Sequence, residues 1–153
     1  MRALIQRTTG ASVKVDDEVI GEIGTGLVVF LGVKFDDREE DIDYLVEKIC
    51  GLRIFSDAEG KFNDSLEDLQ DSVLIISQFT LYADTRKGRR PGFTDSARPE
   101  TAIPLYETFI SKFKARGIQV QCGRFGADMK VSLLNDGPVT VMLDSEDKFP
   151  RKV

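Results

Sequence analysis

The sequence predicts a mixed α/β fold, in which layers of mixed β-sheet pack against two helices within a single domain spanning residues 1–153. Three observations predict it. The chain starts with short β-branched segments, two later stretches carry apolar residues at helical spacing, and three more strand-like segments close the chain. With 41% hydrophobic and 31% charged residues, the composition is that of a globular protein able to bury one core.

The first third of the chain is predicted to consist of strands. The turn formers Thr9-Gly10 and Asp16-Asp17 separate short segments that are rich in β-branched residues. The apolar run Leu27–Val33 then predicts a strand that is buried on both faces. The short segments are Leu4–Arg7, Ala11–Val15 and Val19–Ile23.

A helix is expected to start at Asp37, because Glu40 follows it at the spacing of a capping box. Turn formers at 57–63 predict a hairpin after this helix, and Val73–Ile76 is a second buried strand. The predicted core face of the helix has apolar residues at i, i+3, i+4 and i+7: Ile42, Leu45, Val46 and Ile49.

The second half of the chain is predicted to contain a long polar loop at 84–97, a second helix and three strands. The helix runs from Pro99, which suits a first turn, to Arg116, and Pro104 either kinks it or marks a later start. Its core face is Tyr106, Phe109, Ile110 and Phe113. The strands are Ile118–Cys122, Met129–Leu134 and Val139–Leu143, with a tight turn at 136–138 between the last two.

The chain contains no histidine. This excludes Ser-His-Asp and Cys-His catalysis, so hydrolysis would have to use hydroxyls, carboxylates, lysines, backbone amides or the substrate itself. No sequence motif requires a metal or a cofactor. The net charge of −5 argues against a protein that coats nucleic acid. No apolar run approaches the ~20 residues of a membrane span, so a cytoplasmic location is the default expectation.

Two motifs stand out: Ser77-Gln78-Phe79-Thr80-Leu81 after a predicted strand, and Asn135-Asp136-Gly137-Pro138-Val139-Thr140. From the residues alone, the first is a strand end that caps local backbone, and the second is a hairpin turn with a trans proline. Together they match SQxxL and NxGPxT, and the chain thereby resembles the D-aminoacyl-tRNA deacylases, also called the D-tyrosyl-tRNA deacylase family. The resemblance continues at residues 1–7, 11–13, 87–91 and 125–129, while Gly92 departs from an expected serine.

The resemblance implies a cytoplasmic homodimeric hydrolase with a proofreading role in translation. It would cleave the ester of D-aminoacyl-tRNA, and of mischarged glycyl-tRNA, to free amino acid and tRNA. It further implies that the Gly137–Pro138 bond is cis and enters the partner's pocket, where its carbonyls face the substrate's α-amino group. Rigid carbonyls there would direct an L side chain into the wall and reject it.

For catalysis, the resemblance assigns Ser77, Gln78, Phe79 and Thr80 to the site. Backbone N–H groups near Gln78, Phe79 and Thr80 are expected to stabilise the oxyanion. Two alternatives stay open for the attack. Thr80 is the nucleophile, or the 2′-hydroxyl of the tRNA assists a water molecule. We favour the second alternative, because no protein base is visible in the sequence.

Four cations lie within five residues, at Arg86, Lys87, Arg89 and Arg90. They form either a solvated loop or a contact to tRNA phosphates, which we favour beside an ester-cleaving pocket. The resemblance places Arg7 beside the Gly-Pro turn. It places Ala102, Phe125 and Met129 at the pocket, although composition alone favours a core position for Phe125 and Met129. The expected partners are the aminoacylated end of tRNA and a second copy of the chain, without a membrane or DNA.

Two hypotheses from other classes compete with the deacylase. A noncatalytic RNA-binding module would use the basic loop without releasing amino acid. A serine or threonine esterase would act on small molecules, but the absent histidine and the lack of a GxSxG elbow argue against it.

Overall fold

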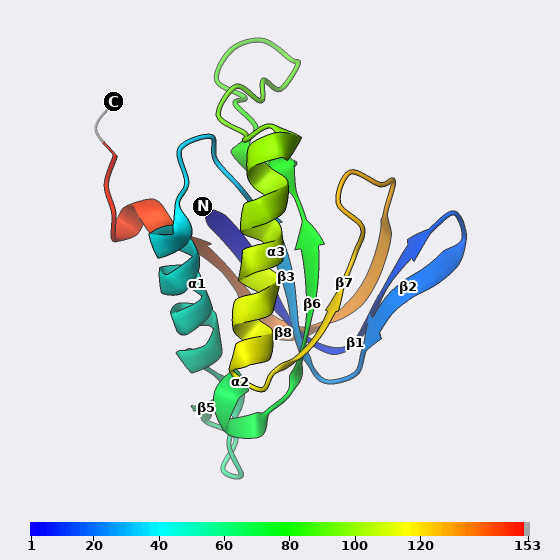
Figure 1. Cartoon of the computed structure of the whole chain (residues 1–153). Helices are drawn as coiled ribbons and strands as arrows, with labels where there is room; N and C mark the ends of the chain where they lie inside the picture. The colour runs from blue at the N-terminus through cyan, green and yellow to red at the C-terminus, as the bar shows by residue number, and fades with distance from the viewer. Residues whose placement is uncertain (152–153) are drawn as a thin grey trace.

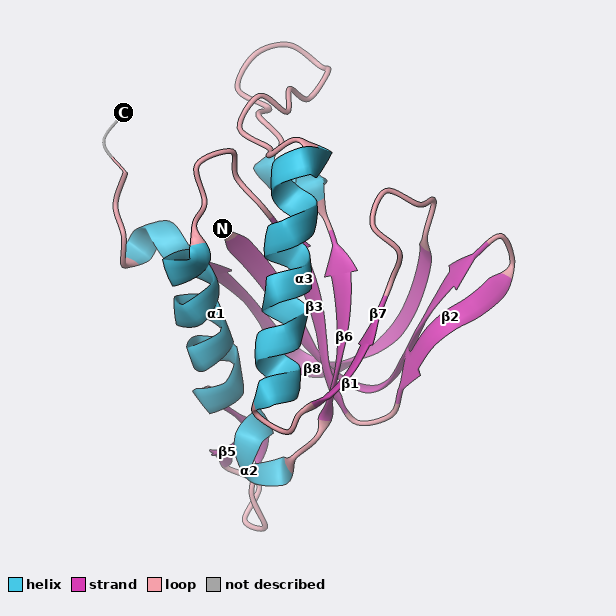
Figure 2. Cartoon of the chain, viewed as in Figure 1, coloured by secondary structure: helices cyan, strands magenta, loops and turns pink. Residues whose placement is uncertain are grey.

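The structure, a computed structural model, describes residues 1–151 apart from the side chain of Pro138. A six-stranded mixed sheet forms its centre, and a two-stranded hairpin of β4 and β5 lies apart from it (Figure 2). The strands are β1 (Arg2–Val15), β2 (Glu18–Ile23), β3 (Gly26–Gly32), β4 (Arg53–Ser56), β5 (Phe62–Ser65), β6 (Ser72–Ser77), β7 (Gln119–Cys122) and β8 (Lys130–Asp144). The helices are α1 (Glu39–Gly51), the single turn α2 (Leu66–Leu69) and α3 (Pro99–Ala115), with 3₁₀ turns η1 (Phe79–Tyr82) and η2 (Ser145–Asp147).

The sheet has the order β2-β1-β3-β6-β7, and β8 pairs with the other edge of β1. Strands β3, β6 and β7 run parallel, so the carboxyl ends of β3 and β6 meet at the same edge of the sheet. In open α/β sheets, ligands bind at the carboxyl ends of the strands. The edge where Leu31 pairs with Ser77 is therefore where a site is expected.

Helices α1 and α3 lie side by side on one face of the sheet (Figure 1). Both predicted helices are confirmed, and so is the mixed α/β fold class. Helix α3 begins at Pro99 and continues through Pro104, which excludes the later start. The predicted core faces are buried, with Ile110 half-buried at the margin. No helix within residues 1–151 is both long and apolar enough to cross a membrane.

On its other face the sheet curls, so that β2 approaches β6 and β7. Gly21 permits this approach, since a Cβ there would lie 3.0 Å from the Cys122 carbonyl oxygen and 3.3 Å from Leu74. A second apolar cluster fills the curl, built around Ala11, Val13, Ile23, Val28, Leu74 and Ile76. The central strands β3 and β6 are thus buried on both faces, which fixes their position.

Two turns predicted from the sequence are wrong. Thr9-Gly10 lies inside the long strand β1, at an irregularity in its pairing. The Thr8 hydroxyl donates to the Gly10 carbonyl oxygen and accepts from the Gly10 N–H, which stabilises this irregularity. Residues 136–138 are not a hairpin turn either, because the segments on both sides pair with β1 in succession. The last two predicted strands are one strand, β8, with a bulge opposite Arg7.

The predicted start of the first helix at Asp37 is also wrong. The buried Asp37 carboxylate accepts from the N-terminal ammonium of Met1 at 2.7 Å and from the Lys34 N–H at 2.6 Å. Helix α1 instead follows Arg38, whose backbone N–H donates to Asp41 at 2.7 Å. The capping-box spacing pointed to Asp37, but this carboxylate binds the N-terminal ammonium and the Lys34 N–H and does not cap the helix.

Candidate active site

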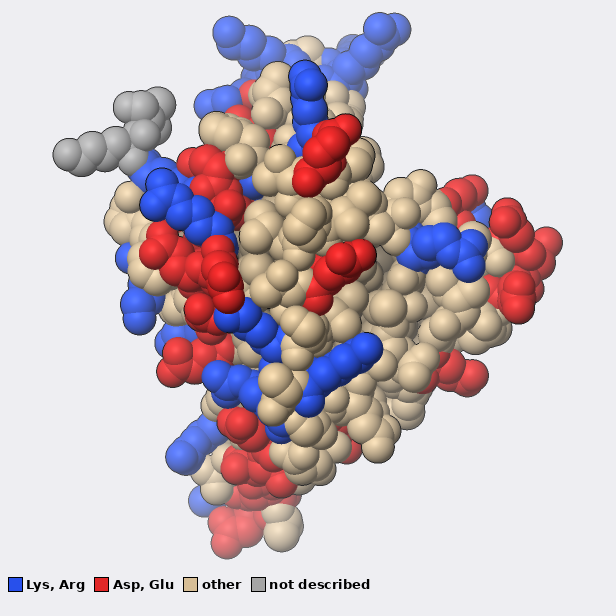
Figure 3. All heavy atoms as spheres, viewed as in Figure 1, with Lys and Arg blue, Asp and Glu red and all other residues tan. Residues whose placement is uncertain are grey.

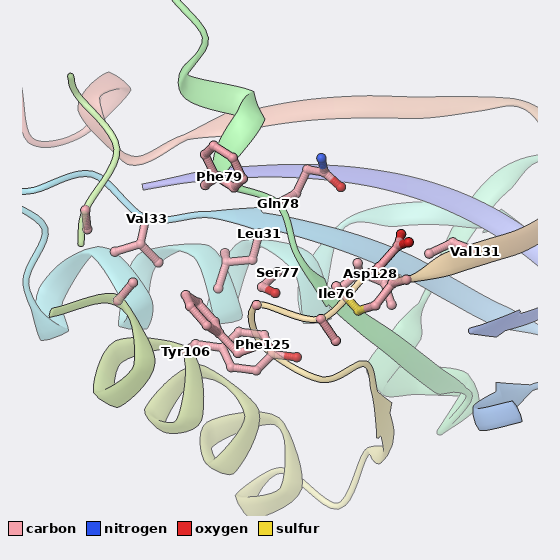
Figure 4. A pocket seen from close by; sticks show the side chains of 15 residues that line it. Leu31, Val33, Ile76, Ser77, Gln78, Phe79, Tyr106, Phe125, Asp128 and Val131 are labelled. Carbon is pink, nitrogen blue, oxygen red and sulfur yellow. The ribbon is translucent and has the colours of Figure 1, made fainter. Parts of the chain in front are cut away.

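A cavity of about 270 Å³ opens at the carboxyl end of β6 (Figure 4). Its walls come from β3, β6, the start of η1, helix α3, the 123–129 loop and the start of β8 at Val131. The structure brings six of the predicted site residues together there: Ser77, Gln78, Phe79, Ala102, Phe125 and Met129. Among the described side chains, those of Thr80 and Arg7 do not line this cavity within the single chain, and neither does Gly137. The side chain of Pro138, also a predicted site residue, lies outside the described part of the structure.

The SQFTL motif forms the end of β6 and the turn η1. The Gln78 N–H donates to the Leu31 carbonyl at 2.7 Å, which extends the parallel pairing one step beyond Ser77. Gly32 leaves room for the turn, because a Cβ there would lie 3.1 Å from both the Gln78 carbonyl oxygen and the Leu81 Cβ. The start of a helical turn leaves its first N–H groups without an intrahelical acceptor. Of the three amides predicted to act on the oxyanion, those of Phe79 and Thr80 therefore remain available.

The side chains of the motif point in different directions. Ser77 lies in the cavity wall between Leu31 and Ile76, while Gln78 points away from the aromatic floor (Figure 4). The Gln78 amide donates to the Thr80 hydroxyl, and Thr80 is exposed outside the cavity. Its hydroxyl is thus held at the surface by Gln78, without a carboxylate or amine bonded to it in the described residues.

Two aromatic rings from different elements form the floor of the cavity. The rings of Tyr106 on α3 and Phe125 have centroids 5.8 Å apart at 59°. The Tyr106 hydroxyl donates to the Ile75 carbonyl at 3.1 Å, and burial raises the pKa of Tyr106, so it stays a neutral donor. The helical spacing of Tyr106 predicts only a core position and gives no sign that one edge of the ring lines a cavity.

Phe125 and Met129 belong both to the cavity wall and to the core. Each is half-buried, Phe125 against the helix-side cluster and Met129 against the cluster within the curl. Met129 packs over Gly123, where a Cβ would clash with its sulfur. Each of these side chains thus packs against the core on one side and lines the cavity on the other.

The NxGPxT motif forms the bulge of β8. The Asn135 side-chain amide donates to the Val139 carbonyl at 3.0 Å and to the Arg7 carbonyl at 3.3 Å, which closes the bulge against β1. The Thr140 hydroxyl donates to the Asn135 side-chain oxygen at 3.4 Å and accepts from Gln6 at 3.2 Å. The first and last residues of the motif are therefore the ones that hold the loop together.

Arg7 supports the bulge from beneath. Its Nε lies 3.1 Å from the Asp136 carboxylate and donates to the Asp136 carbonyl at 3.3 Å. Its Nη1 donates to the Ile54 carbonyl at 2.7 Å, and only 8% of the side chain is exposed. Because Arg7 holds the Asp136 carbonyl and Asn135 holds that of Val139, both sides of the exposed Gly137 are pinned.

Within one chain, the bulge and the cavity lie at opposite ends of the sheet. The bulge is opposite Arg7, which pairs with Leu27, at the end where β3 enters the sheet. The cavity is at Leu31, four residues further along β3, which corresponds to about 13 Å along a strand. The bulge therefore does not complete the cavity of its own chain.

The basic loop projects from the top of the molecule, above α3 and the end of β6, where Lys and Arg side chains gather (Figures 1 and 3). Its base is closed by two backbone hydrogen bonds between Asp84 and Gly92, at 2.8 and 2.9 Å. Arg86 binds Asp84 with two contacts of 2.8 Å, and this pair lowers the pKa of Asp84. Within the described residues, Lys87, Arg89 and Arg90 form no ion pair, so they present the charge of the loop.

Ser96 and Phe93, which the sequence analysis did not single out, tie this loop to η1. The Ser96 hydroxyl donates to the Phe79 carbonyl at 3.0 Å, and the rings of Phe79 and Phe93 pack edge to face at 5.0 Å. No metal-binding cluster of three or more Asp, Glu or Cys occurs among residues 1–151.

Comparison with known proteins gives consistent results. Residues 4–144 match the family model described as D-Tyr-tRNA(Tyr) deacylase. Proteins named D-aminoacyl-tRNA deacylase from Chloroflexus aurantiacus and Dehalococcoides mccartyi are 58% and 57% identical, covering 99% and 97% of this chain and 96% and 97% of theirs.

Two solved structures share the fold. A c-Myc DNA unwinding element binding protein is 40% identical with a TM-score of 0.88, over 94% of this chain and 98% of that one. A probable eukaryotic D-amino acid tRNA deacylase is 21% identical with a TM-score of 0.81, over 93% and 97%, and supports the fold alone.

Proposed function

The chain belongs to the D-Tyr-tRNA(Tyr) deacylase family, and we propose that it hydrolyses the ester between a D-amino acid and tRNA in the cavity beside η1. It is a hydrolase of aminoacyl-tRNA, as its deacylase relatives are named. The observation that carries the assignment of the site is the position of the Phe79 and Thr80 amides at the end of β6, beside a cavity lined by Ser77. The noncatalytic RNA-binding module and the small-molecule esterase lose support because the match covers nearly the whole chain.

The proposed reaction is attack of water on the ester carbonyl, with the amides of Phe79 and Thr80 donating to the oxyanion. Such donors contribute most when they are fixed before the reaction starts. The Leu31–Gln78 hydrogen bond and the packing against Gly32 fix this turn. The ester C–O bond then breaks, and the 3′-oxygen of the tRNA leaves with a proton. The 2′-hydroxyl next to it assists the attacking water. The described lining of the cavity contains no histidine or lysine, and Asp128 is its one carboxylate.

Chiral selection is assigned to the Gly137–Pro138 segment of a partner copy, with a cis peptide bond. The pinned carbonyls of Asp136 and Val139 give the stiffness that steric rejection of an L side chain requires. Glycine has no side chain to reject, so glycyl-tRNA is a second substrate. Because the bulge lies far from the cavity of its own chain, the proposal requires a twofold homodimer with two equivalent sites.

Contact to tRNA phosphates is assigned to Lys87, Arg89 and Arg90. Arg86 contributes less than its place in the sequence suggests, because Asp84 neutralises it. Each lost phosphate contact flattens the dependence of log affinity on log salt by about 0.7–0.9.

The assay that tests this function compares D-aminoacyl-tRNA, L-aminoacyl-tRNA and a simple ester of the same amino acid. We expect rapid release of the D-amino acid, slow release of the L-amino acid, and no cleavage of the simple ester. Equal rates on D- and L-aminoacyl-tRNA would refute the chiral selection. Binding of aminoacyl-tRNA without release of the amino acid would identify a noncatalytic module.

Replacing Thr80 by alanine should leave substantial activity. The hydroxyl lies outside the cavity and is held by Gln78, while the backbone N–H of residue 80 is kept. A tRNA ending in 2′-deoxyadenosine, aminoacylated at its 3′ position, should by contrast be a poor substrate. Single-turnover rates would measure both. A loss of about 10²–10³-fold for Thr80→Ala, with normal cleavage of the deoxy substrate, would make Thr80 the nucleophile instead.

A further inference from the structure

Three phenylalanines are connected through the segment 93–96, and one of them, Phe79, lines the cavity. Phe35 and Phe79 are 58% and 55% exposed, which is unusual for side chains of this size. The Phe35 N–H donates to the Asp95 carbonyl at 3.1 Å, Ser96 bonds the Phe79 carbonyl, and Phe93 packs on Phe79. We call Phe35, Phe79 and Phe93 the aromatic rim.

The rim joins the cavity to the basic loop. Phe79 itself lines the cavity, and so do Val33 and Ala97. Val33 lies two residues before Phe35 and Ala97 four residues after Phe93, and the Ala97 N–H donates to the Val33 carbonyl at 2.9 Å. Phe93 lies three residues after Arg90, the last of the loop cations. The Lys34 ammonium, which is paired with Glu146, lies 5.7 Å from the centre of the Phe35 ring. Exposed rings among cations are the combination that binds unpaired nucleotides, since every base has a face to stack and every linkage has a charge.

We propose that the aromatic rim is a stacking subsite for the unpaired nucleotides that precede the terminal adenosine of the tRNA. The inference rests on the proposed function, in which the cavity takes the aminoacylated terminal nucleotide and the loop takes phosphates. The strand between those two contacts has to pass the rim. Because all four bases can stack on an aromatic ring, the subsite recognises unpaired nucleotides whatever their sequence.

The decisive comparison uses two substrates that differ only in these nucleotides: D-aminoacyl-tRNA and 3′-O-D-aminoacyl adenosine. For Phe35→Ala we expect the fold-loss in kcat/KM to be about ten times larger for the tRNA than for the nucleoside ester. Phe35→Trp keeps a stacking face and should restore the tRNA rate. Leu69→Ala is the matched control: it removes another exposed apolar side chain, 43% exposed, on α2 at the far end of the molecule, and both rates should stay at wild-type values.

Salt dependence separates stacking from charge. Arg89→Glu with Arg90→Glu should flatten the dependence of tRNA affinity on salt, whereas Phe35→Ala should lower affinity with the slope unchanged, because stacking releases no counterions. An unchanged slope in the double arginine variant would remove the loop from the tRNA interface and overturn the path past the rim.

Three further results would overturn the subsite. They are equal losses on both substrates for Phe35→Ala, no loss on the tRNA, or a shift of Phe35→Ala from dimer to monomer in light scattering, which would assign the ring to a subunit contact. Failure of the wild-type chain to cleave either substrate is a different outcome, because it refutes the proposed function itself.

Discussion

Mixing two separately inactive variants of this chain should restore about a quarter of the wild-type deacylase activity. The first is Ala102→Phe, which fills the cavity at a position that is 4% exposed. The second is Gly137→Leu. A Cβ on Gly137 meets no atom closer than 3.9 Å in its own chain, so there is room for it there, but a leucine side chain would obstruct a partner's cavity.

The expected fraction follows from twofold symmetry. Random exchange makes half of the dimers mixed, and each mixed dimer has one site that combines the intact cavity of one chain with the intact bulge of the other. If the bulge acted within its own chain, no mixed dimer would have an intact site. The measurement is D-aminoacyl-tRNA hydrolysis after co-refolding, with each variant refolded alone as the control. Activity no higher than that of the separate variants would refute the shared site.

The helices could be predicted from the sequence, and the long strands could not. Helical spacing depends on one face of one element, so Ile42, Leu45, Val46 and Ile49 could be assigned to the core without knowing the partner. Strands β1 and β8 depend on each other over their whole length. Thr9-Gly10 and Asp136-Gly137 look like turns because their composition is that of turns, but pairing with the neighbouring strand absorbs both as irregularities.

Six of the predicted site residues line one cavity, but their separation from Gly137 along the sheet could not be predicted from local sequence patterns. Ser77, Gln78 and Phe79 follow a buried strand, which is enough to place them at a sheet edge. The position of Gly137 depends on register, which a bulge shifts. Tyr106, Phe93 and Ser96 were missed because their contacts to Phe125 and Phe79 join residues from different elements, and no local pattern encodes such contacts.

Replacing Phe79 by proline should lower the single-turnover rate by about 10²–10³-fold relative to Phe79→Ala, the size of effect seen when one oxyanion donor is removed. Both variants lose the ring, and hence any stacking contribution, but only proline loses the backbone N–H. Position 79 is the first residue of η1, where proline fits without loss of a helical hydrogen bond. Gln78 before it is not helical, with φ of −144° and ψ of 78°.

The comparison is informative because the competing explanations change different quantities. A disturbed turn would lower the melting temperature of Phe79→Pro below that of Phe79→Ala, whereas a lost donor changes only the rate. The nucleoside ester is the better substrate for this test, since it lacks the nucleotides that are proposed to stack on the aromatic rim. Equal rates for the two variants at equal stability would show that the Phe79 amide does not bind the oxyanion. The Thr80 amide would then be the only donor left of the three predicted, since the Gln78 amide is already bonded to Leu31.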